Sequence, residues 1–294
     1  MALSVTGGIF INMCSAHLIY DTLEKFPAGG PHSLSWSADG KKIALADRFS
    51  VHIIDLASNV SELLFEYETL VDKVIFSPSN DHIAVLEQNK KIHIIKLSLY
   101  QNRIIGSGYD MKWNKDGYFL YYWNNDKCFQ GTLNGDTADE VAYIQGDWSI
   151  FNQVVFCGEN NRIKIADRDG SGAYFLDDVL DSTAINGMNT WGDEVKWSPD
   201  GYQIAFSQSS DKERIYIAHL LKKECYFLIE GWKQKWSPNG EKILYSDRHE
   251  KEIFCIPLKD DASIKIGEGS NPIWSPSGKE IAFVSDYSVF IQKI

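Results

Sequence analysis

The sequence lacks a long apolar run and an excess of basic residues. No stretch approaches the roughly 18 consecutive apolar residues of a membrane span, and the first basic residue is Lys25, so the basic start of a signal peptide is missing. The chain has 29 lysines and arginines against 40 acidic residues, a net charge of −11. Nucleic acid and anionic membranes attract basic surfaces, so neither is expected as a partner. We expect a cytoplasmic protein.

Paired cysteines are also missing. The five cysteines are odd in number, widely spaced and form no C-x-x-C pair, which disfavours a disulfide framework and a zinc site. We therefore expect reduced thiols and no bound metal.

Linear catalytic motifs are absent as well. The sequence contains no G-x-S-x-G elbow, no phosphate-binding GxxxxGK[ST] loop and no GxGxxG. The segment HEKE (249–252) has no second histidine to complete a zinc-binding helix. No cofactor is expected, and the sequence favours a protein without catalytic activity.

What the sequence does contain is a repeat: an aromatic residue, a tight polar turn and a short apolar strand. The clearest copies are WSADGKKIAL (36–45), WSPDGYQIAF (197–206), WSPNGEKILY (236–245) and WSPSGKEIAF (274–283). An aliphatic residue follows each aromatic anchor by seven positions. The seven anchors found this way are Trp36, Phe76, Trp113, Phe156, Trp197, Trp236 and Trp274.

Each repeat reads as four short strands. Apolar residues alternate with polar ones, and Pro with Gly or Asn marks a turn after the anchor. Third strands are recognisable, for example, in SVHIIDL (50–56) and RIYIAHL (214–220), and a weaker fourth strand in ECYFLI (224–229). Four antiparallel strands per roughly 40 residues form one propeller blade. The sequence therefore predicts an all-β, seven-bladed propeller as a single domain over 1–294, with the anchor tryptophans packed between blades.

The repeat unit resembles that of TolB-like propellers, which are relatives of WD repeats. The resemblance rests on W-S-P-D-G-x-x-I-A-F and on Asp-Arg after the second strand, as in Asp47-Arg48, Asp167-Arg168 and Asp247-Arg248, and it covers about 32–294. No Gly-His or Trp-Asp dipeptide occurs, so the hydrogen-bonded tetrad of true WD repeats is not implied. The resemblance implies the propeller fold, without the function of TolB.

The last repeat supplies only three strands before the chain ends. We expect the segment at about 16–22, AHLIYDT, to become the outer strand of the last blade, because an open ring would expose a blade edge. The strand-like segment at 7–13 could instead join that blade, as a second N-terminal strand or a fifth strand.

The predicted binding site lies on the loops that enter the inner strands, around the channel mouth. Positions three and four residues before each anchor vary between copies and are mostly polar. Trp148, Trp191 and Trp232 lie outside the anchor register and are interpreted as partner contacts, a sugar-stacking surface or partly buried packing residues. The predicted site residues are His32, Asp72, Tyr109, Asp110, Trp148, Trp191, Asp193, Glu194, Trp232 and Lys233.

Two functions of different classes fit this pattern. The preferred one is a non-catalytic interaction scaffold for a neutral to basic protein or peptide, with Trp232, Asp193 and Glu194 at the focus. The alternative is a small-molecule or glycan binder, or a lyase- or hydrolase-like enzyme that uses carboxylates at the channel mouth. Fold alone does not choose between them.

Overall fold

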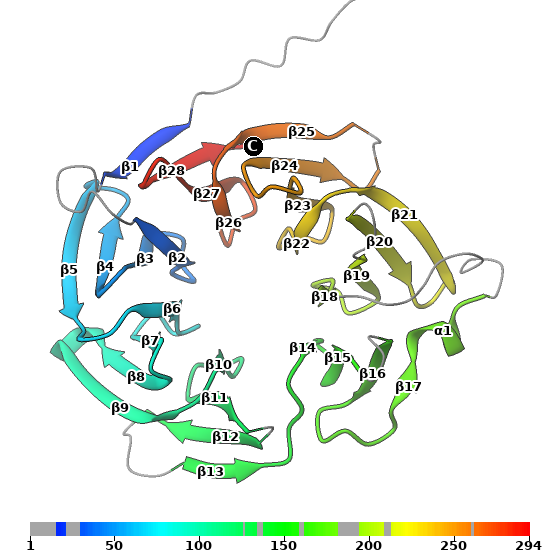
Figure 1. The fold of residues 1–294 in the computed structure, drawn as a ribbon, viewed down its shortest axis with the longest axis horizontal. Coiled ribbons are helices and arrows are strands. Elements are labelled where there is room, and N and C mark those ends of the chain that lie inside the picture. Colours follow the sequence, from blue (N-terminus) through cyan, green and yellow to red (C-terminus); the bar gives the residue numbers. More distant parts are fainter. Residues whose placement is uncertain are drawn as a thin grey trace, which may run out of the picture.

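A computed structural model shows seven four-stranded antiparallel sheets arranged as blades around a central axis (Figure 1). The predicted all-β, seven-bladed propeller is therefore confirmed. The described residues are 16–21, 30–125, 127–133, 138–158, 162–181, 194–208, 213–259 and 262–294.

Strands A and B of each blade lie nearest the axis. The A strands are β2 (Pro31–Trp36), β6 (Val71–Phe76), β10 (Asp110–Trp113), β14 (Asp147–Trp148), β18 (Glu194–Trp197), β22 (Trp232–Trp236) and β26 (Ser270–Trp274). The B strands are β3 (Lys42–Asp47), β7 (His82–Glu87), β11 (Phe119–Asn124), β15 (Gln153–Cys157), β19 (Gln203–Gln208), β23 (Lys242–Ser246) and β27 (Glu280–Ser285).

Strands C and D complete each blade toward the outside. The C strands are β4 (Ser50–Asp55), β8 (Lys91–Lys96), β12 (Lys127–Thr132), β16 (Ile163–Asp167), β20 (Arg214–His219), β24 (Glu252–Pro257) and β28 (Ser288–Lys293). The D strands are β5 (Val60–Glu66), β9 (Gln101–Ser107), β13 (Ala138–Val141), β17 (Tyr174–Phe175), β21 (Glu224–Glu230), β25 (Ile264–Glu268) and β1 (His17–Asp21). The described helices are short: the 3₁₀ turn η1 (Leu97–Leu99) and α1 (Leu176–Val179).

The serine after the anchor builds the turn between strands A and B. In the fifth blade the Ser198 N–H donates to the Gln203 carbonyl at 2.8 Å, and Ser198 Oγ accepts the Gln203 N–H at 2.9 Å. Asp200 then accepts from Ser198 Oγ and from the Tyr202 N–H. Gly201 has a φ of 74°, which glycine adopts without strain. The letters Ser-Pro-Asp-Gly thus specify one hydrogen-bonded turn.

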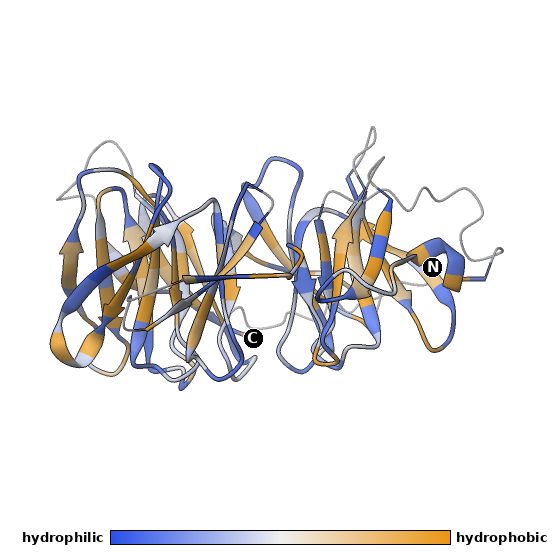
Figure 2. Cartoon of the chain, turned by 90° about the horizontal axis from the view of Figure 1, so that it is seen from below, coloured by the Kyte–Doolittle hydropathy of each residue, from blue (hydrophilic) through white to orange (hydrophobic). Residues whose placement is uncertain are grey.

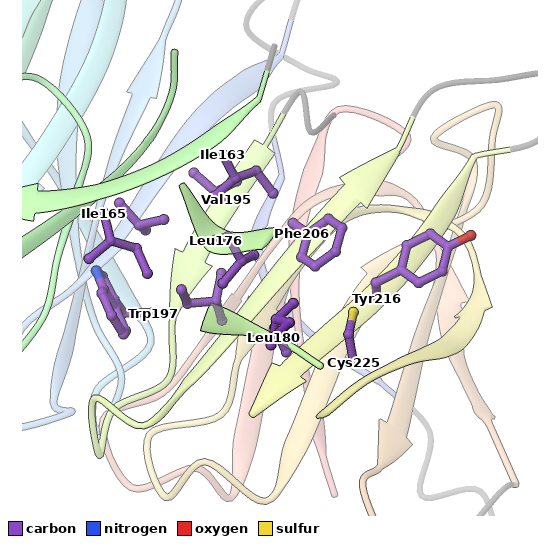
Figure 3. Close-up of a cluster of buried hydrophobic side chains, with 12 residues drawn as sticks. Ile163, Ile165, Leu176, Leu180, Val195, Trp197, Phe206, Tyr216 and Cys225 are labelled. Atoms are coloured by element: carbon purple, nitrogen blue, oxygen red, sulfur yellow. The ribbon is translucent and has the colours of Figure 1, made fainter. Parts of the chain in front are cut away.

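The anchor aromatic fills the space between neighbouring blades. Trp197 is buried in one cluster with Ile163 and Ile165 of the fourth blade and with Phe206 of its own blade (Figure 3). The strands are mostly apolar, whereas polar residues gather in the loops at the two ends of the blades (Figure 2). Burial between blades is the main term that holds the ring together.

The N-terminal segment closes the ring as predicted. Strand β1 pairs antiparallel with β28, with His17 opposite Ile291 and Leu18 opposite Phe290. Ile19 and Tyr20 are buried in the cluster between the last and first blades. The last blade thus takes one strand from one end of the chain and three from the other. The segment at 7–13 lies outside the described residues.

The fourth blade corrects one prediction. Phe156 lies in the B strand β15, and Trp148 ends the inner strand β14. Asp147 Oδ2 accepts the Trp197 N–H, as Ser35 Oγ in the first blade accepts the anchor N–H of the second. Trp148 is therefore the fourth anchor.

A deletion explains why the repeat register failed there. Ser149 bonds Gln153 four residues on, whereas the equivalent serines elsewhere bond a residue five positions on. Trp148 consequently faces Val154, and the usual turn letters are missing. The segment starting at Phe156 satisfies the seven-residue offset through Ile163, which belongs to the C strand β16.

No helix in the described part of the chain is long and apolar enough to cross a membrane.

Candidate functional site

The channel wall is formed by alternate residues of the A strands. Side chains alternate along a strand. Because the anchor is buried between blades, the residues one and three positions before it point toward the axis. The position directly before the anchor carries Ser35, Ile75, Lys112, Asp147, Lys196, Lys235 and Ile273. Two residues earlier stand the charged residues Lys73, Asp110, Glu194 and Lys233, of which Lys233 pairs with Glu250.

Of these residues, those of the first five blades, except Glu194, line a cavity of about 420 Å³ inside the channel. Its charged and polar lining comes from the A strands of the first five blades: Ser35, Lys73, Asp110, Lys112, Asp147 and Lys196. This volume lies within the range of small-molecule sites.

An ion pair occupies one side of the channel. Lys73 Nζ lies 2.8 Å from Asp110 Oδ1, and Gln145 Nε2 donates to Asp110 Oδ2 at 3.3 Å. Burial acts to raise the pKa of Asp110, but Lys73, the Met111 N–H and Gln145 outweigh it and hold that pKa below its ordinary value. Asp110 is therefore a carboxylate at neutral pH.

Lys112 lies between a carboxylate and an aromatic ring. Its Nζ is 3.8 Å from Asp147 Oδ1 and 5.0 Å from the centroid of Trp148. Burial lowers the pKa of Lys112, Asp147 opposes this, and the positive charges of Lys196 and Arg168 add to it.

Lys196 and Lys235 stand on consecutive blades and lack such pairing. Lys235 Nζ donates to the Pro272 carbonyl at 2.9 Å, and within the described residues neither ammonium has a carboxylate oxygen within 4 Å. Burial lowers the pKa of Lys235 to about 8; Glu194 opposes the shift, while Lys196, Lys233 and Lys73 reinforce it. We call Lys73, Lys112, Lys196 and Lys235 the channel lysines.

The fold is shared with proteins of unrelated function. Two structures of oligogalacturonate lyase are similar to this chain. One, in complex with manganese, has 14% identity, coverage of 88% of each chain and a TM-score of 0.65. The other, from Vibrio parahaemolyticus, has 14% identity, coverage of 94% of this chain and 93% of that chain, and a TM-score of 0.69.

A chain of the mitotic checkpoint complex is equally similar. It has 14% identity, covers 100% of this chain and 96% of its own, and has a TM-score of 0.69. No family model matches the sequence, and no curated protein matches it. At these identities the likeness shows the propeller fold alone.

The structure uses several predicted site residues for contacts within the protein. His32 Nε2 bonds the Val71 carbonyl, and Lys233 Nζ pairs with Glu250 at 2.7 Å. Trp148 packs against Tyr121, and its Nε1 donates to the Ile144 carbonyl at 3.3 Å. Its assignment outside the anchor register was wrong, because it is the anchor of its blade.

The remaining predicted residues have mixed settings. Asp72 and Tyr109 are exposed, and Trp232 is half-buried at the start of β22. The structure brings Asp110 and Glu194 to the channel. Trp191 and Asp193 lie outside the described residues, so a joint site with Trp232 stays a prediction.

Sequence reasoning missed most of the channel lysines. The signal was present as a Lys-Trp dipeptide in three repeats: Lys112-Trp113, Lys196-Trp197 and Lys235-Trp236. The predicted site comprised positions three and four residues before each anchor, and Lys73 is the one channel lysine at such a position. Within the described part of the chain, no three His, Cys, Asp or Glu residues gather as metal ligands would.

An apolar surface lies at the other end of two blades. We call the face formed by the A–B and C–D turns the lower face, and Ile150, Phe151, Tyr202 and Leu221 on it the lower patch. Their exposed fractions are 61%, 50%, 40% and 70%. The rings of Phe151 and Tyr202 are 5.4 Å apart, and the Leu220 N–H donates to the Tyr202 carbonyl. The turns of the fourth and fifth blades thus present one apolar surface.

Proposed function

We propose that the protein is a non-catalytic interaction module that binds another protein through the lower patch. The observation that carries this proposal is the substitution of Ile150 and Phe151 into a turn that is polar or proline-containing in every other blade. The equivalent pairs are Ala38-Asp39, Pro78-Ser79, Lys115-Asp116, Pro199-Asp200, Pro238-Asn239 and Pro276-Ser277.

The substitution has little benefit for the isolated ring. Ile150 and Phe151 remain at least half exposed, so most of their apolar surface stays in water. Exposed aromatic and aliphatic clusters on a polar protein are typical of interaction sites, where they are buried by the partner. A neutral to basic partner suits the net charge of −11.

The opposite loop face stays a second candidate surface for the same function. It carries the exposed Asp72 and Tyr109. We also propose kinship with TolB-like repeats, which the Trp-Ser-Pro-Asp-Gly turn at 197–201 and its variants at 36–40, 236–240 and 274–278 support.

Quantitative affinity capture from the native host tests the proposal. The wild type is compared with Ile150→Ser/Phe151→Ser, with Leu99→Ser as a matched control, and with Asp72→Asn/Tyr109→Ala on the opposite face. Leu99 is exposed in a C–D turn of the lower face but belongs to the second blade, away from the lower patch. All four proteins should melt alike, because exposed substitutions change stability little.

The lower-patch variant should recover its specific partner at least about tenfold less well, while Leu99→Ser recovers it as the wild type does. If Asp72→Asn/Tyr109→Ala loses the partner and the lower-patch variant still recovers it, the binding site lies on the opposite face. If the wild type captures nothing beyond what an unrelated propeller captures, the proposed function is wrong.

A further inference from the structure

The channel of this acidic protein carries an excess of positive charge. Four channel lysines face three carboxylates, Asp110, Asp147 and Glu194, although the whole chain has a net charge of −11. Charges of one sign in a low-dielectric recess concentrate the field and attract counter-ions of the opposite sign.

The carboxylates leave the channel lysines unequally compensated. Asp110 is held by Lys73 at 2.8 Å. Asp147 is engaged with Lys112 and with the Trp197 N–H, which donates to its Oδ2 at 2.7 Å. Among the described residues, Lys196 has no ion pair or hydrogen bond through its side chain. Lys235 donates only to a neutral carbonyl, and Glu194 acts on it from beyond ion-pair distance.

The ammonium groups also act on one another across the channel. Lys196 and Lys73 both disfavour the charged form of Lys235, although Lys73 lies on the second blade and Lys235 on the sixth. Lys196 disfavours the charged form of Lys112 in the same way. Partly buried like charges without counter-ions destabilise the fold, and an anion between them would relieve this repulsion.

We propose that the central channel is a binding site for a small, multiply charged oxyanion, whose phosphate or carboxylate group lies between Lys196 and Lys235, within reach of Lys112. The cavity of about 420 Å³ beside Lys196 has room for the rest of such a molecule. Asp110 and Asp147 can accept hydrogen bonds from hydroxyl or amino groups on the ligand.

The geometry favours small anions over polymers. Lys73, Lys112 and Lys196 line one cavity inside the ring, and nucleic acid is disfavoured by the acidic net charge of the chain. The site is separate from the lower patch, so failure of either proposal leaves the other standing.

Calorimetric titration of the full chain with inorganic phosphate and with citrate, at constant ionic strength, tests the proposal. The variants are Lys196→Met and Lys235→Met, which keep the length of the side chain and remove its charge. Lys196→Arg retains the charge. Lys222→Met is the matched control, because Lys222 is an exposed residue of the C–D turn in the fifth blade and its loss changes net charge equally.

The wild type, Lys196→Arg and Lys222→Met should bind at least one probe, whereas each methionine substitution in the channel should weaken binding by about tenfold or more. Bound anion should also raise the melting temperature of the wild type. Equal affinity in Lys196→Met and Lys222→Met would overturn the proposal. So would the lack of any heat or melting shift with the wild type at about 50 mM of either probe.

Discussion

The indole Nε1 of Trp113 donates a 3.2 Å hydrogen bond to the backbone carbonyl of Ile75 on the preceding blade. The A strand is the inner edge of its sheet, where backbone groups have no neighbouring strand on one side and must find other partners. Two further anchors repeat the bond: Trp236 to Lys196 at 3.1 Å and Trp274 to Lys235 at 3.2 Å. The anchor therefore joins consecutive blades by a directed bond as well as by packing, and all three of these bonds hold strands that carry channel lysines.

Replacing an anchor tryptophan by phenylalanine isolates this bond. Trp113 and Trp36 are both 8% exposed, but among the described residues the Trp36 indole N–H has no acceptor. Trp113→Phe should therefore lower the free energy of unfolding by about 1 kcal/mol more than Trp36→Phe. Urea denaturation measures both. Equal losses would show that packing alone joins the blades.

The fourth anchor can be tested by large-to-small substitution. Both side chains are partly exposed, but Trp148 packs against the cluster between the third and fourth blades, whereas Phe156 belongs to a B strand and to no such cluster among the described residues. Trp148→Ala should cost about 3–5 kcal/mol in unfolding free energy, and Phe156→Ala should cost clearly less. The reverse order would restore Phe156 as the anchor.

Ring closure depends on one face of β1. Ile19 is buried between the last and first blades, and its neighbour Leu18 is exposed on the other side of the strand. Ile19→Asp should therefore lower the melting temperature strongly, because it buries a charge at the closure. Leu18→Asp, the control, should melt close to the wild type. Two similar melting curves would mean that β1 contributes little to closure.

Lys235 should make stability depend on pH in a defined window. Its pKa is about 8 in the fold against 10.5 in the unfolded chain, so between these values the unfolded state binds more protons and stability rises with pH. Below pH 8 both states are charged and the fold carries the full cost of the buried ammonium. Lys235→Met removes that cost, so at pH 7 the variant should be more stable, by on the order of a few kcal/mol.

Denaturation of both proteins at pH 7, 9 and 10 measures the difference between their free energies of unfolding. All titrating groups other than Lys235 are present in both proteins. The advantage of the variant should shrink as the pH rises from 8 toward 10.5. An advantage that does not change with pH would show that Lys235 is not the group that titrates.

Repeated local chemistry explains why most of the architecture could be predicted. The turn that follows Trp197 is specified by four adjacent residues, and the anchor precedes the turn directly, so both are visible in sequence. The fourth blade failed because the turn after Trp148 is one residue short, and a nearby segment at Phe156 imitates the spacing. A register deduced from spacing alone does not survive such a deletion.

The sequence by itself determined the fold class, the blade number and the closing strand, because these follow from period-two patterning, turn residues and an aromatic repeated every 40 residues or so. Only the tertiary structure decided what the channel contains. Lys73 and Lys235 are far apart in the chain, and their charges meet because ring closure turns the A strands toward one axis. Alternation along a strand predicts that a residue lies on the side opposite to its anchor. Only the closed ring turns that direction into a shared, partly buried space in which the channel lysines and their carboxylates act on one another.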